Sequence, residues 1–247
     1  MTAEIRVIPL LGIPELVEGD DLPRLLVEAA VPAGGFEQRD VVVVAQKAVS
    51  KVEGRVVHLS EVQPSPKAHE LAGDQDPRRI EVILRESRDI VRTRPPLIIS
   101  ETPHGFVCAS AGVDASNAKG PDTLVLLPLD PDASAERLRT GIRELTGVDV
   151  GLIVSDSFGR AWRRGTTDVA LGVSGIVALL DLEGERDSMG YRLHATEIAV
   201  ADEIAGAAQL VTGKTEGIPA AIVRGVLAAG DGRGSDLLMP RERDLFR

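Results

Sequence analysis

Three oxygen-bearing side chains, Ser155, Asp156 and Ser157, directly follow a short apolar run over residues 150–154. The run is rich in β-branched residues, so we expect a buried strand that stops at Ser155. A carboxylate at the end of a buried strand is a common position for holding a metal ion near phosphates. The stretch therefore predicts a cation site, with an Asp turn at a strand end as the alternative.

Basic side chains come next along the chain, at Arg160, Arg163 and Arg164. A guanidinium group can bind two oxygens of a phosphate or carboxylate at once, so this cluster suits an anionic ligand. The alternative is the solvated basic start of a helix, which gives the same pattern.

Two further apolar runs lead into polar clusters. Residues 40–45 predict a buried strand, and the segment Q-K-A-V-S-K-V-E-G-R follows, which could hold phosphates or form a solvated β-ribbon. Residues 105–111 predict a strand of a hairpin, and Asp114, Ser116 and Asn117 follow it. Asp and Asn are common in turns, but a second acidic cluster after a strand favours a metal site.

The composition excludes several classes of protein. The 247 residues carry a formal net charge of −10 with one Trp, one Tyr and four Phe, which argues against general nucleic-acid binding. No apolar run is long enough to span a membrane, and the N-terminus lacks the features of a signal peptide. The single cysteine, Cys108, lies in an apolar run and is expected to be a buried, unreactive thiol. These features predict a cytoplasmic protein.

Familiar site motifs are absent from the sequence. Gly213-Lys214-Thr215 resembles the end of a phosphate-binding P-loop, but Ala208 stands where that motif requires its first glycine. Four His and one Cys give little support for a zinc site or a thiol nucleophile. The available ligands are oxygens, which favour Mg²⁺ or Mn²⁺.

Strand and helix patterns alternate irregularly along the chain. Capping residues and helical spacing indicate helices after Asp21, Asp76, Asp130 and Thr196. We predict an α+β fold with mixed sheets, in one domain over residues 1–247 whose two intertwined subdomains meet at a hinge near residues 93–96. The expected strands cover residues 5–10, 40–45, 97–100, 105–111, 124–129, 150–154 and 218–223, and the longer helices cover residues 76–92, 130–145 and 196–211.

Several segments together resemble the coenzyme F420-0:L-glutamate ligase (γ-glutamyl ligase) family. They occur in order over nearly the whole chain, and the strings D-S-F-G-R-x-W-R and A-G-V-D-x-S-N are specific. The segments are G-I-P-E-L, Q-K-A-V-S-K-V-E-G-R, A-G-V-D-A-S-N, S-D-S-F-G-R-A-W-R, T-E-I-A-V-A-D-E-I-A and E-G-I-P-A-A-I-V-R-G.

The resemblance implies a ligase that uses GTP and two divalent cations, Mg²⁺ or Mn²⁺, to add L-glutamate to the deazaflavin coenzyme precursor F420-0. Further glutamates are then joined through γ-linkages. The resemblance also implies an α+β fold with two subdomains in an intertwined homodimer, and potassium as an additional cofactor. Some relatives carry a fused flavin-reductase-like domain after the D-L-F sequence; this chain stops there, at Arg247, and we expect no such domain.

The same resemblance assigns site residues. Asp114 and Asp156 match ligands of one metal, and Ser157 matches a ligand of the second. Relatives offer a Gln as a metal ligand near residues 213–217, where Glu216 is the candidate in this chain. Nucleotide contacts are implied for Ile13, Pro14, Glu15, Leu16, Gln46, Lys51 and Asn117.

The implied chemistry agrees with these residues. Joining a carboxylate to an amine in water requires activation, and transfer of the GTP γ-phosphoryl group would give an acyl phosphate that the glutamate amine attacks. All the reactants are anionic, so two cations and clustered Lys and Arg would offset their repulsion. We expect Lys51 to contact phosphate, and Arg160 and Arg163 to bind substrate carboxylates or stabilise transition-state charge.

Two other functions would use the same residues. A metal-dependent GTP or phosphate-ester hydrolase would release phosphate without an acceptor. A GTP-sensing binding module would bind GTP tightly without turnover. The products formed from GTP, Mn²⁺, F420-0 and glutamate distinguish the three.

Overall fold

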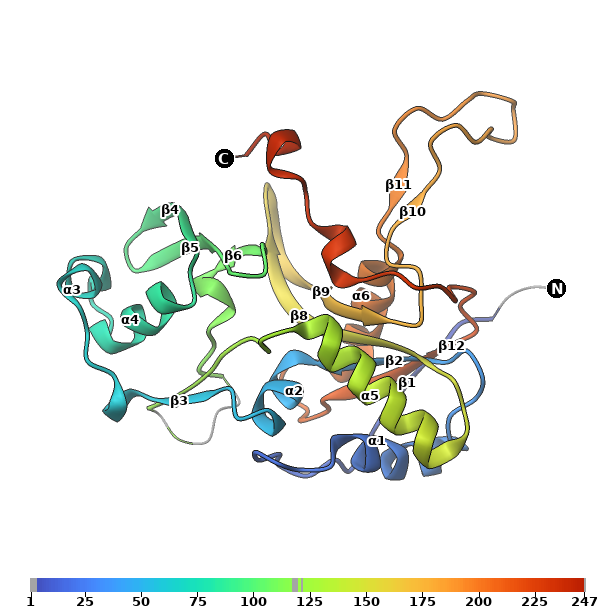
Figure 1. Cartoon of the computed structure of the whole chain (residues 1–247), viewed down its shortest axis with the longest axis horizontal. Helices are drawn as coiled ribbons and strands as arrows, with labels where there is room; N and C mark the ends of the chain where they lie inside the picture. The colour runs from blue at the N-terminus through green and yellow to red at the C-terminus, as the bar shows by residue number, and fades with distance from the viewer. Residues whose placement is uncertain (1–3, 117–119, 121, 247) are drawn as a thin grey trace.

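A five-stranded mixed sheet forms the centre of the molecule (Figure 1). Its strands, in spatial order, are β1 (Arg6–Pro9), β12 (Ala220–Arg224), β2 (Val41–Ala45), β8 (Gly151–Arg160) and β9 (Arg163–Ser174). Strand β2 runs parallel to β8, and the other neighbouring pairs in this sheet are antiparallel. The computed structural model describes residues 4–116, 120 and 122–246 of the chain.

Helices cover both faces of this sheet. They are α1 (Leu22–Ala30), α5 (Pro131–Thr146) and α6 (Val200–Thr212). On one face, α1 and α5 pack in a buried cluster with Val42 and Val44 of β2. On the other face, α6 packs with Val41 and Val43. Because successive strand residues point to opposite faces, the continuous valine run of β2 contributes to both hydrophobic cores.

A second, smaller group of elements lies between α2 and α5 in the sequence and has a core of its own around Ile80, Ile83 and Leu124. In Figure 1 this group lies to the left of the main sheet. Helix α2 (Gln46–Val52) precedes the group. The elements of the group are β3 (Val56–His58), α3 (Pro66–Ala72), α4 (Pro77–Arg85), β4 (Asp89–Arg94), β5 (Leu97–Glu101), β6 (Val107–Ala109) and β7 (Thr123–Val125).

A long arm between β9 and α6 projects away from both groups (Figure 1). Its base is a two-stranded sheet of β10 (Leu180–Asp181) and β11 (Glu197–Ile198). Its outer part exposes the large apolar side chains of Met189 and Tyr191. The arm therefore presents apolar surface at a distance from the main sheet.

Local sequence signals fix several helix boundaries as predicted. Asp21 and Asp130 cap α1 and α5, because their side-chain oxygens accept hydrogen bonds from backbone N–H groups over 3.1 Å and 3.0 Å. Gly147 ends α5 in the left-handed conformation that glycine adopts at least cost. Short 3₁₀ turns occupy Val31–Ala33, Leu59–Glu61, Ser110–Gly112, Gly234–Leu237 and Arg241–Arg243.

The predicted end of a strand at Ser155 is wrong. Strand β8 continues to Arg160 and pairs with β9 around a two-residue loop at Ala161 and Trp162. The basic residues after Asp156 therefore belong to a hairpin, and the alternative of a helix start is wrong as well. Ser, Asp and Gly have low strand propensity, so only the pairing with β9 explains the extended backbone here.

Three predictions about helices also require correction. The helix predicted over residues 76–92 ends at Arg85, because the chain beyond it pairs with β5 as strand β4. The basic segment after β2 is the helix α2 rather than a solvated ribbon. Helix α6 begins at Val200 rather than after Thr196, because the intervening residues form β11.

The combination of helices with parallel and antiparallel strands confirms the predicted α+β class. Residues 93–96, predicted as a hinge, lie at the turn between β4 and β5 inside the smaller group, where the Pro95–Pro96 peptide is cis. The intertwining of two subdomains stays a prediction. None of the helices in the described part of the chain combines the length and the hydropathy that a membrane span requires.

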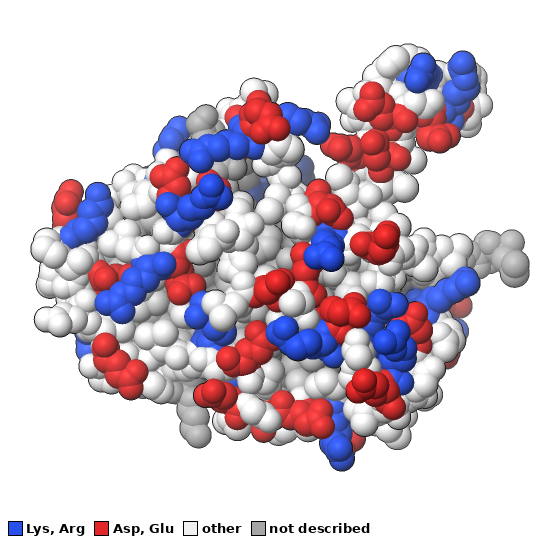
Figure 2. All heavy atoms as spheres, in the orientation of Figure 1, with Lys and Arg blue, Asp and Glu red and all other residues white. Residues whose placement is uncertain are grey.

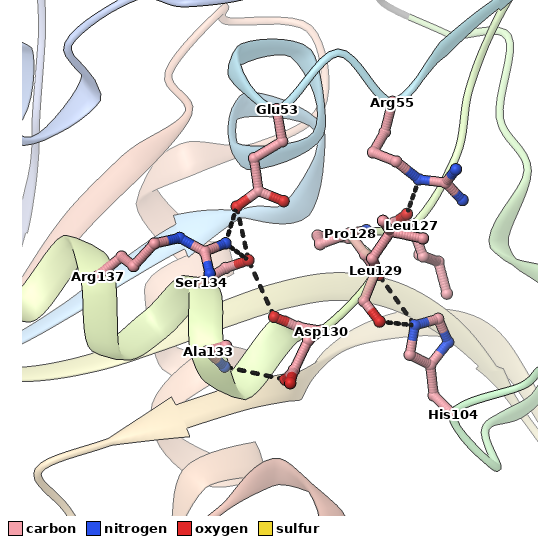
Figure 3. Close-up of polar contacts among 10 residues, drawn as sticks. All are labelled: Glu53, Arg55, His104, Leu127, Pro128, Leu129, Asp130, Ala133, Ser134 and Arg137. Carbon is pink, nitrogen blue, oxygen red and sulfur yellow. Dashed lines mark hydrogen bonds and ion pairs between the residues drawn. The ribbon is translucent and has the colours of Figure 1, made fainter.

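Polar contacts join the smaller group to the helices of the main sheet (Figure 3). Arg55 donates from Nε to the Leu127 carbonyl oxygen over 2.9 Å. Glu53 accepts hydrogen bonds from Ser134 Oγ and from Arg137 Nη2, both at 2.6 Å. The residues just after α2 thereby hold both the connection that follows β7 and the first turns of α5.

His104 makes a second connection at this junction (Figure 3). Its Nε2 lies 2.9 Å from the Pro128 carbonyl oxygen and 3.1 Å from that of Leu129. A carbonyl oxygen only accepts, so Nε2 must carry a hydrogen. The ring also stacks on Phe106 at a centroid distance of 5.5 Å. The loop before β6 is thus fixed to the segment that leads into α5.

Helix α5 approaches the sheet closely at Gly172 of β9. A Cβ at this position would lie 2.0 Å from the carbonyl oxygen of Pro131, which is backbone and cannot rotate away. A Cβ at Gly159 of the neighbouring strand would meet nothing within 4 Å. The two glycines therefore form a matched pair for testing this contact.

Gly172→Ala should lower the free energy of unfolding by about 3 kcal/mol, because α5 must move away from β9 to admit the methyl group. Gly159→Ala should change the free energy of unfolding by less than about 1 kcal/mol. Urea denaturation of both variants and the wild type measures these differences. Equal effects of the two substitutions would contradict the close contact.

Candidate functional site

A pocket opens where β2 ends and its parallel neighbour β8 continues. Ala45 of β2 pairs with Ser155 of β8, and the chain then turns into α2. The start of α2, the loop over residues 13–16 and the segment over residues 212–219 surround the polar residues of β8. Of the predicted site residues, those that line the pocket are Ile13, Pro14, Glu15, Leu16, Gln46, Lys51, Asp156 and Ser157.

Gln46 lines this pocket. Its side chain is buried, and its Oε1 accepts a hydrogen bond from Ser50 Oγ over 2.8 Å. Its Nε2 has no partner among the residues that the structure describes. A buried N–H group without an acceptor is destabilising, so the side chain is suited to an acceptor atom on a ligand.

Lysine side chains give the pocket positive charge. Lys47, Lys51 and Lys214 all line it. The Nζ of Lys51 lies 2.5 Å from Glu15 Oε1, while the Lys51 side chain is only 12% exposed and that of Glu15 is 62% exposed. The exposed glutamate can move into solvent, so an anionic ligand can replace it at the held ammonium group.

Asp114 lies beside the pocket through its contact with Lys47. The Lys47 Nζ is 2.6 Å from Asp114 Oδ2, and Ser116 donates to Asp114 from its backbone N–H and its hydroxyl. Burial acts to raise the pKa of Asp114, but the hydrogen bonds from Lys47 and Ser116 outweigh it and hold the pKa below its usual value. Asp114 is therefore ionised at neutral pH.

At Asp156, burial outweighs the groups that lower the pKa, which is the opposite of the balance at Asp114. Burial raises the pKa of this carboxyl to about 6, although the Ser157 N–H and the charges of Lys47 and Lys214 act to lower it. The negative charge of Asp114 raises it further. The two carboxylates predicted to share a cation therefore lie close enough to repel each other in the absence of one.

Asp168 was missed by the sequence analysis. It lies opposite Ser157 in the β8–β9 pairing, accepts a hydrogen bond from Ser157 Oγ over 2.6 Å, and lines the pocket. Gln209 of α6 donates from Nε2 to Ser157 Oγ over 3.4 Å. Regular pairing outward from the loop at residues 161–162 would align Ser157 with Thr166, and a register shift between Gly159 and Arg160 moves its partner to Asp168, so the sequence carried no signal for this residue.

Some predicted residues lie elsewhere. Glu216 is exposed, and its carboxylate accepts hydrogen bonds from the backbone N–H and the hydroxyl of Thr215 in its own loop, at 2.9 Å each. Arg160 and Arg163 face each other across the tip of the β8–β9 hairpin, outside the pocket lining. Asn117 lies outside the described residues. Cys108 is buried, as predicted, and burial raises the pKa of its thiol to about 12.

The donor set fits a small, hard cation that keeps water and substrate oxygens in its coordination shell. The described residues include no group of three or more His, Cys, Asp or Glu side chains arranged to hold a metal alone. Mg²⁺ is usually held by one or two carboxylates together with waters and phosphate oxygens. Asp114 with Asp156, and Ser157 with Asp168, provide oxygen donors of that kind.

The fold and the pocket define a class of protein: an α+β chain in which lysines, carboxylates and a buried amide converge where an anionic ligand and a cation would bind. The sequence matches the F420-0:Gamma-glutamyl ligase family over residues 11–225. The chain belongs to this family, as the resemblance of its segments indicated.

The named relatives align with this chain over most of their own length. A coenzyme F420:L-glutamate ligase of Methanocaldococcus jannaschii is 48% identical over 217 residues, which are 86% of each chain. The protein of the same name from Methanothermobacter thermautotrophicus is 44% identical over 98% of this chain and 99% of its own. That from Methanopyrus kandleri is 46% identical over 93% of this chain and 92% of its own.

Asp156→Asn should stabilise the metal-free protein near pH 8, because the variant removes a charge that burial disfavours. The folded carboxyl binds its proton up to a pH of about 6 and the unfolded one only to 3.8, so the wild type loses stability as the pH rises through this window. A tenfold difference in proton affinity corresponds to about 1.4 kcal/mol, so we expect a gain of about 1–3 kcal/mol. Urea unfolding at a series of pH values should show the gain disappearing below about pH 4, where both carboxyls are protonated.

The same variant tests the cation site. Mn²⁺ should raise the melting temperature of the wild type and of the control Asp74→Asn, which changes an exposed acid of the smaller group. It should have little effect on Asp156→Asn. An Asp156→Asn protein whose melting temperature still rises fully with Mn²⁺ would remove Asp156 from the site, since a capping Asp can be replaced by Asn at little cost.

Proposed function

We propose that this chain is a GTP-dependent ligase that adds L-glutamate to coenzyme F420-0 and extends the product through γ-glutamyl linkages. The names of the relatives supply the glutamate and the coenzyme. The observation that carries the proposal for this chain is the convergence of Gln46, Lys51, Lys214 and Asp156 on one pocket. A buried unpaired donor beside ammonium groups suits a phosphorylated ligand with hydrogen-bond acceptors.

The nucleotide would occupy this pocket. The loop over residues 13–16 contributes apolar side chains, and the Gln46 amide offers its free N–H to an acceptor on the base or the phosphates. Lys51 and Lys214 would bind phosphate oxygens, with Glu15 released from Lys51. Asn117, expected to contact the nucleotide as well, lies outside the described residues.

Two divalent cations, Mg²⁺ or Mn²⁺, belong to the proposal. Asp114 and Asp156 would hold one, and Ser157, together with Asp168, would hold the other. When bound, the cations would offset the charge of the phosphates and polarise the transferred phosphoryl group. Potassium stays a prediction from the family resemblance, and assays with and without K⁺ test it.

The reaction balances without an oxidant or reductant. A carboxylate oxygen of F420-0 attacks the γ-phosphorus of GTP, the bond to the β-phosphate oxygen breaks, and GDP leaves. The amine of glutamate then attacks the acyl phosphate carbon, the carbon–oxygen bond to phosphate breaks, and the amine nitrogen loses a proton. Lys47, Lys51 and Lys214 would hold the phosphates in place throughout, which lowers the barrier by orientation and charge stabilisation.

Product masses test the proposal directly. Purified protein with GTP, Mn²⁺, F420-0 and L-glutamate should yield GDP, phosphate and F420-0 heavier by one or more glutamyl units, and omission of any component should prevent the mass gain. GDP formed equally fast without F420-0 would indicate a phosphate-ester hydrolase. Tight GTP binding without any product would indicate a GTP-sensing module.

Lys51→Ala should weaken GTP binding by about 10–100-fold, because it removes one charge-assisted contact, and each 1.4 kcal/mol is tenfold. Glutamate affinity should change much less. The control is Lys67→Ala, which removes an exposed lysine on α3. Titration calorimetry with GTP measures the effect, and equal affinity in the two variants would leave Lys51 with a purely local role in pairing Glu15.

The arm fits the homodimer implied by the family. Met189 and Tyr191 are 90% and 63% exposed on a segment that projects away from the body (Figure 1). Covering such apolar side chains with a second copy would be favourable, and exchange of identical arms is a common route to dimers. Sedimentation should give the mass of a dimer at micromolar concentration, and the mass of a monomer would contradict this arrangement.

A further inference from the structure

The tip of the β8–β9 hairpin exposes a tryptophan between arginines. Ala161 and Trp162 form the loop that joins the paired residues Arg160 and Arg163. Trp162 is 81% exposed, and Arg160, Arg163 and Arg164 are exposed as well. A large aromatic ring with guanidinium groups on both sides is suited to a ligand that is both flat and anionic.

The backbone at Trp162 does not favour tryptophan. Its φ of +58° is a conformation that Gly or Asn adopts at least cost in a two-residue loop. A bulky side chain at such a position is uncommon and indicates that the ring itself has a role. The hairpin could form with a smaller residue, so the role is not the turn.

The arginines at the tip have no acidic partner among the residues that the structure describes. Arg160 donates from Nη2 to the carbonyl oxygen of Arg164 over 3.2 Å, and none of Arg160, Arg163 and Arg164 forms an ion pair within the described residues. Like charges that lie close together repel each other. The chain has a net charge of −10, so it has acidic residues that could have been placed beside these arginines. An anion bound between the guanidinium groups would relieve this repulsion.

The C-terminal segment supports the ring from one side. The rings of Trp162 and Phe246 lie 4.4 Å apart with their planes 58° from each other. Ion pairs from Arg241 to Asp89, at 3.3 Å, and from Arg243 to Glu197, at 3.5 Å, fix this segment to β4 and β11. Figure 1 shows the segment lying over the end of the hairpin, and Figure 2 shows basic side chains gathered at that end of the molecule.

We infer that the hairpin tip binds the acceptor substrate of the proposed ligase, with its deazaflavin ring stacked on Trp162 and with Arg160 and Arg163 contacting the anionic chain that leads from the ring. This inference rests on the proposed function and adds the place of the acceptor, for which the pocket around Gln46 and Lys51 has no aromatic side chain among its described lining residues. It also gives the predicted roles of Arg160 and Arg163 a specific form: they bind the anionic middle of the substrate.

The spacing along β8 supports this arrangement. Arg160 lies four positions after Asp156, which is about 13 Å of strand. Asp156 and Phe158 are alternate residues of β8 and point to the same face of the strand, and the pairing with β9 becomes irregular between Gly159 and Arg160. An acceptor with its ring at the tip can therefore extend along β8 toward Asp156 and the phosphates.

Trp162 is the single tryptophan of the chain, so its fluorescence reports on the site without any label. Titration of the wild type with F420-0 alone, without GTP or glutamate, should quench this emission to a saturating value. GTP alone should quench it much less, because GTP binds in the pocket at the other end of the path. Free tryptophan amide at the same ligand concentrations corrects for absorption of light by the deazaflavin.

Variants separate the ring contact from the anion contact. Trp162→Asn suits the positive φ and should raise the KM for F420-0 by about tenfold or more, as loss of one stacked ring does in nucleic-acid binding. The KM for GTP should not change, and Trp162→Phe should restore most of the affinity for F420-0. Leu227→Asn, a substitution at an apolar residue that is 87% exposed elsewhere, is the surface control.

Arg163→Gln should weaken binding of F420-0 by about tenfold, since it removes a charge-assisted contact. It should not affect binding of a deazaflavin that lacks the anionic chain, which only Trp162→Asn should weaken. Arg143→Gln, on the exposed surface of α5, is the matched charge control.

The outcomes are distinguishable from failure of the proposed function. If the wild type forms no glutamyl product, the proposed ligase is wrong. If the wild type forms product and Trp162→Asn keeps its KM for F420-0, the hairpin site is wrong. A change of Trp162→Asn from dimer to monomer in sedimentation, with unchanged KM, would assign the exposed ring to contact with a second copy and would also overturn the inference.

Discussion

The early end of β2 is the constraint on which the pocket depends. Two parallel strands run side by side until Ala45 meets Ser155, and there one chain turns into α2 while the other continues. Side chains of β8 beyond that point are no longer enclosed between two strands, so hydroxyls and carboxylates can stand there. The valines before that point are buried on both faces of the sheet, where a polar side chain would cost much more free energy than it does beyond that point. One strand thus carries the core in its first half and the candidate chemistry in its second.

The charges at this point depend on one another. Asp156 is disfavoured as an anion by burial, and Asp114 is favoured as one by Lys47 and Ser116. The lysine therefore serves as an internal counter-ion for the two carboxylates. It also makes Asp114 available as a fixed negative charge at any pH near neutrality, because its proton is held less tightly than in water. The pocket is balanced in charge without a ligand, although both signs of charge are concentrated there.

The fold could be predicted from the sequence where a local signal decides the structure. The caps at Asp21 and Asp76 and the valine run of β2 act through neighbouring residues, and all three were predicted correctly. The second half of β8 could not be predicted in this way, because its extended backbone depends on pairing with β9 rather than on its own residues. The same reason hid Asp168, which becomes part of the site only through register. The family resemblance predicted pocket residues such as Gln46 and Lys51. The unpaired donor of Gln46 could be recognised only in the three-dimensional structure.

The contact between Lys47 and Asp114 explains how the pocket could accept its ligands at little electrostatic cost. On the proposed function, a cation that binds Asp114 must displace the Lys47 ammonium, which is 2.6 Å from the carboxylate. The phosphates arrive with that cation and line the same pocket as Lys47, so the ammonium exchanges one oxygen anion for another. Lys51 makes the same exchange when Glu15 leaves it. Each lysine keeps a partner before and after binding, so no buried ammonium is left unpaired, which would cost several kcal/mol. Ligand binding is then an exchange of partners among fixed charges, and α2, which carries both lysines, is the element that couples the cation to the nucleotide.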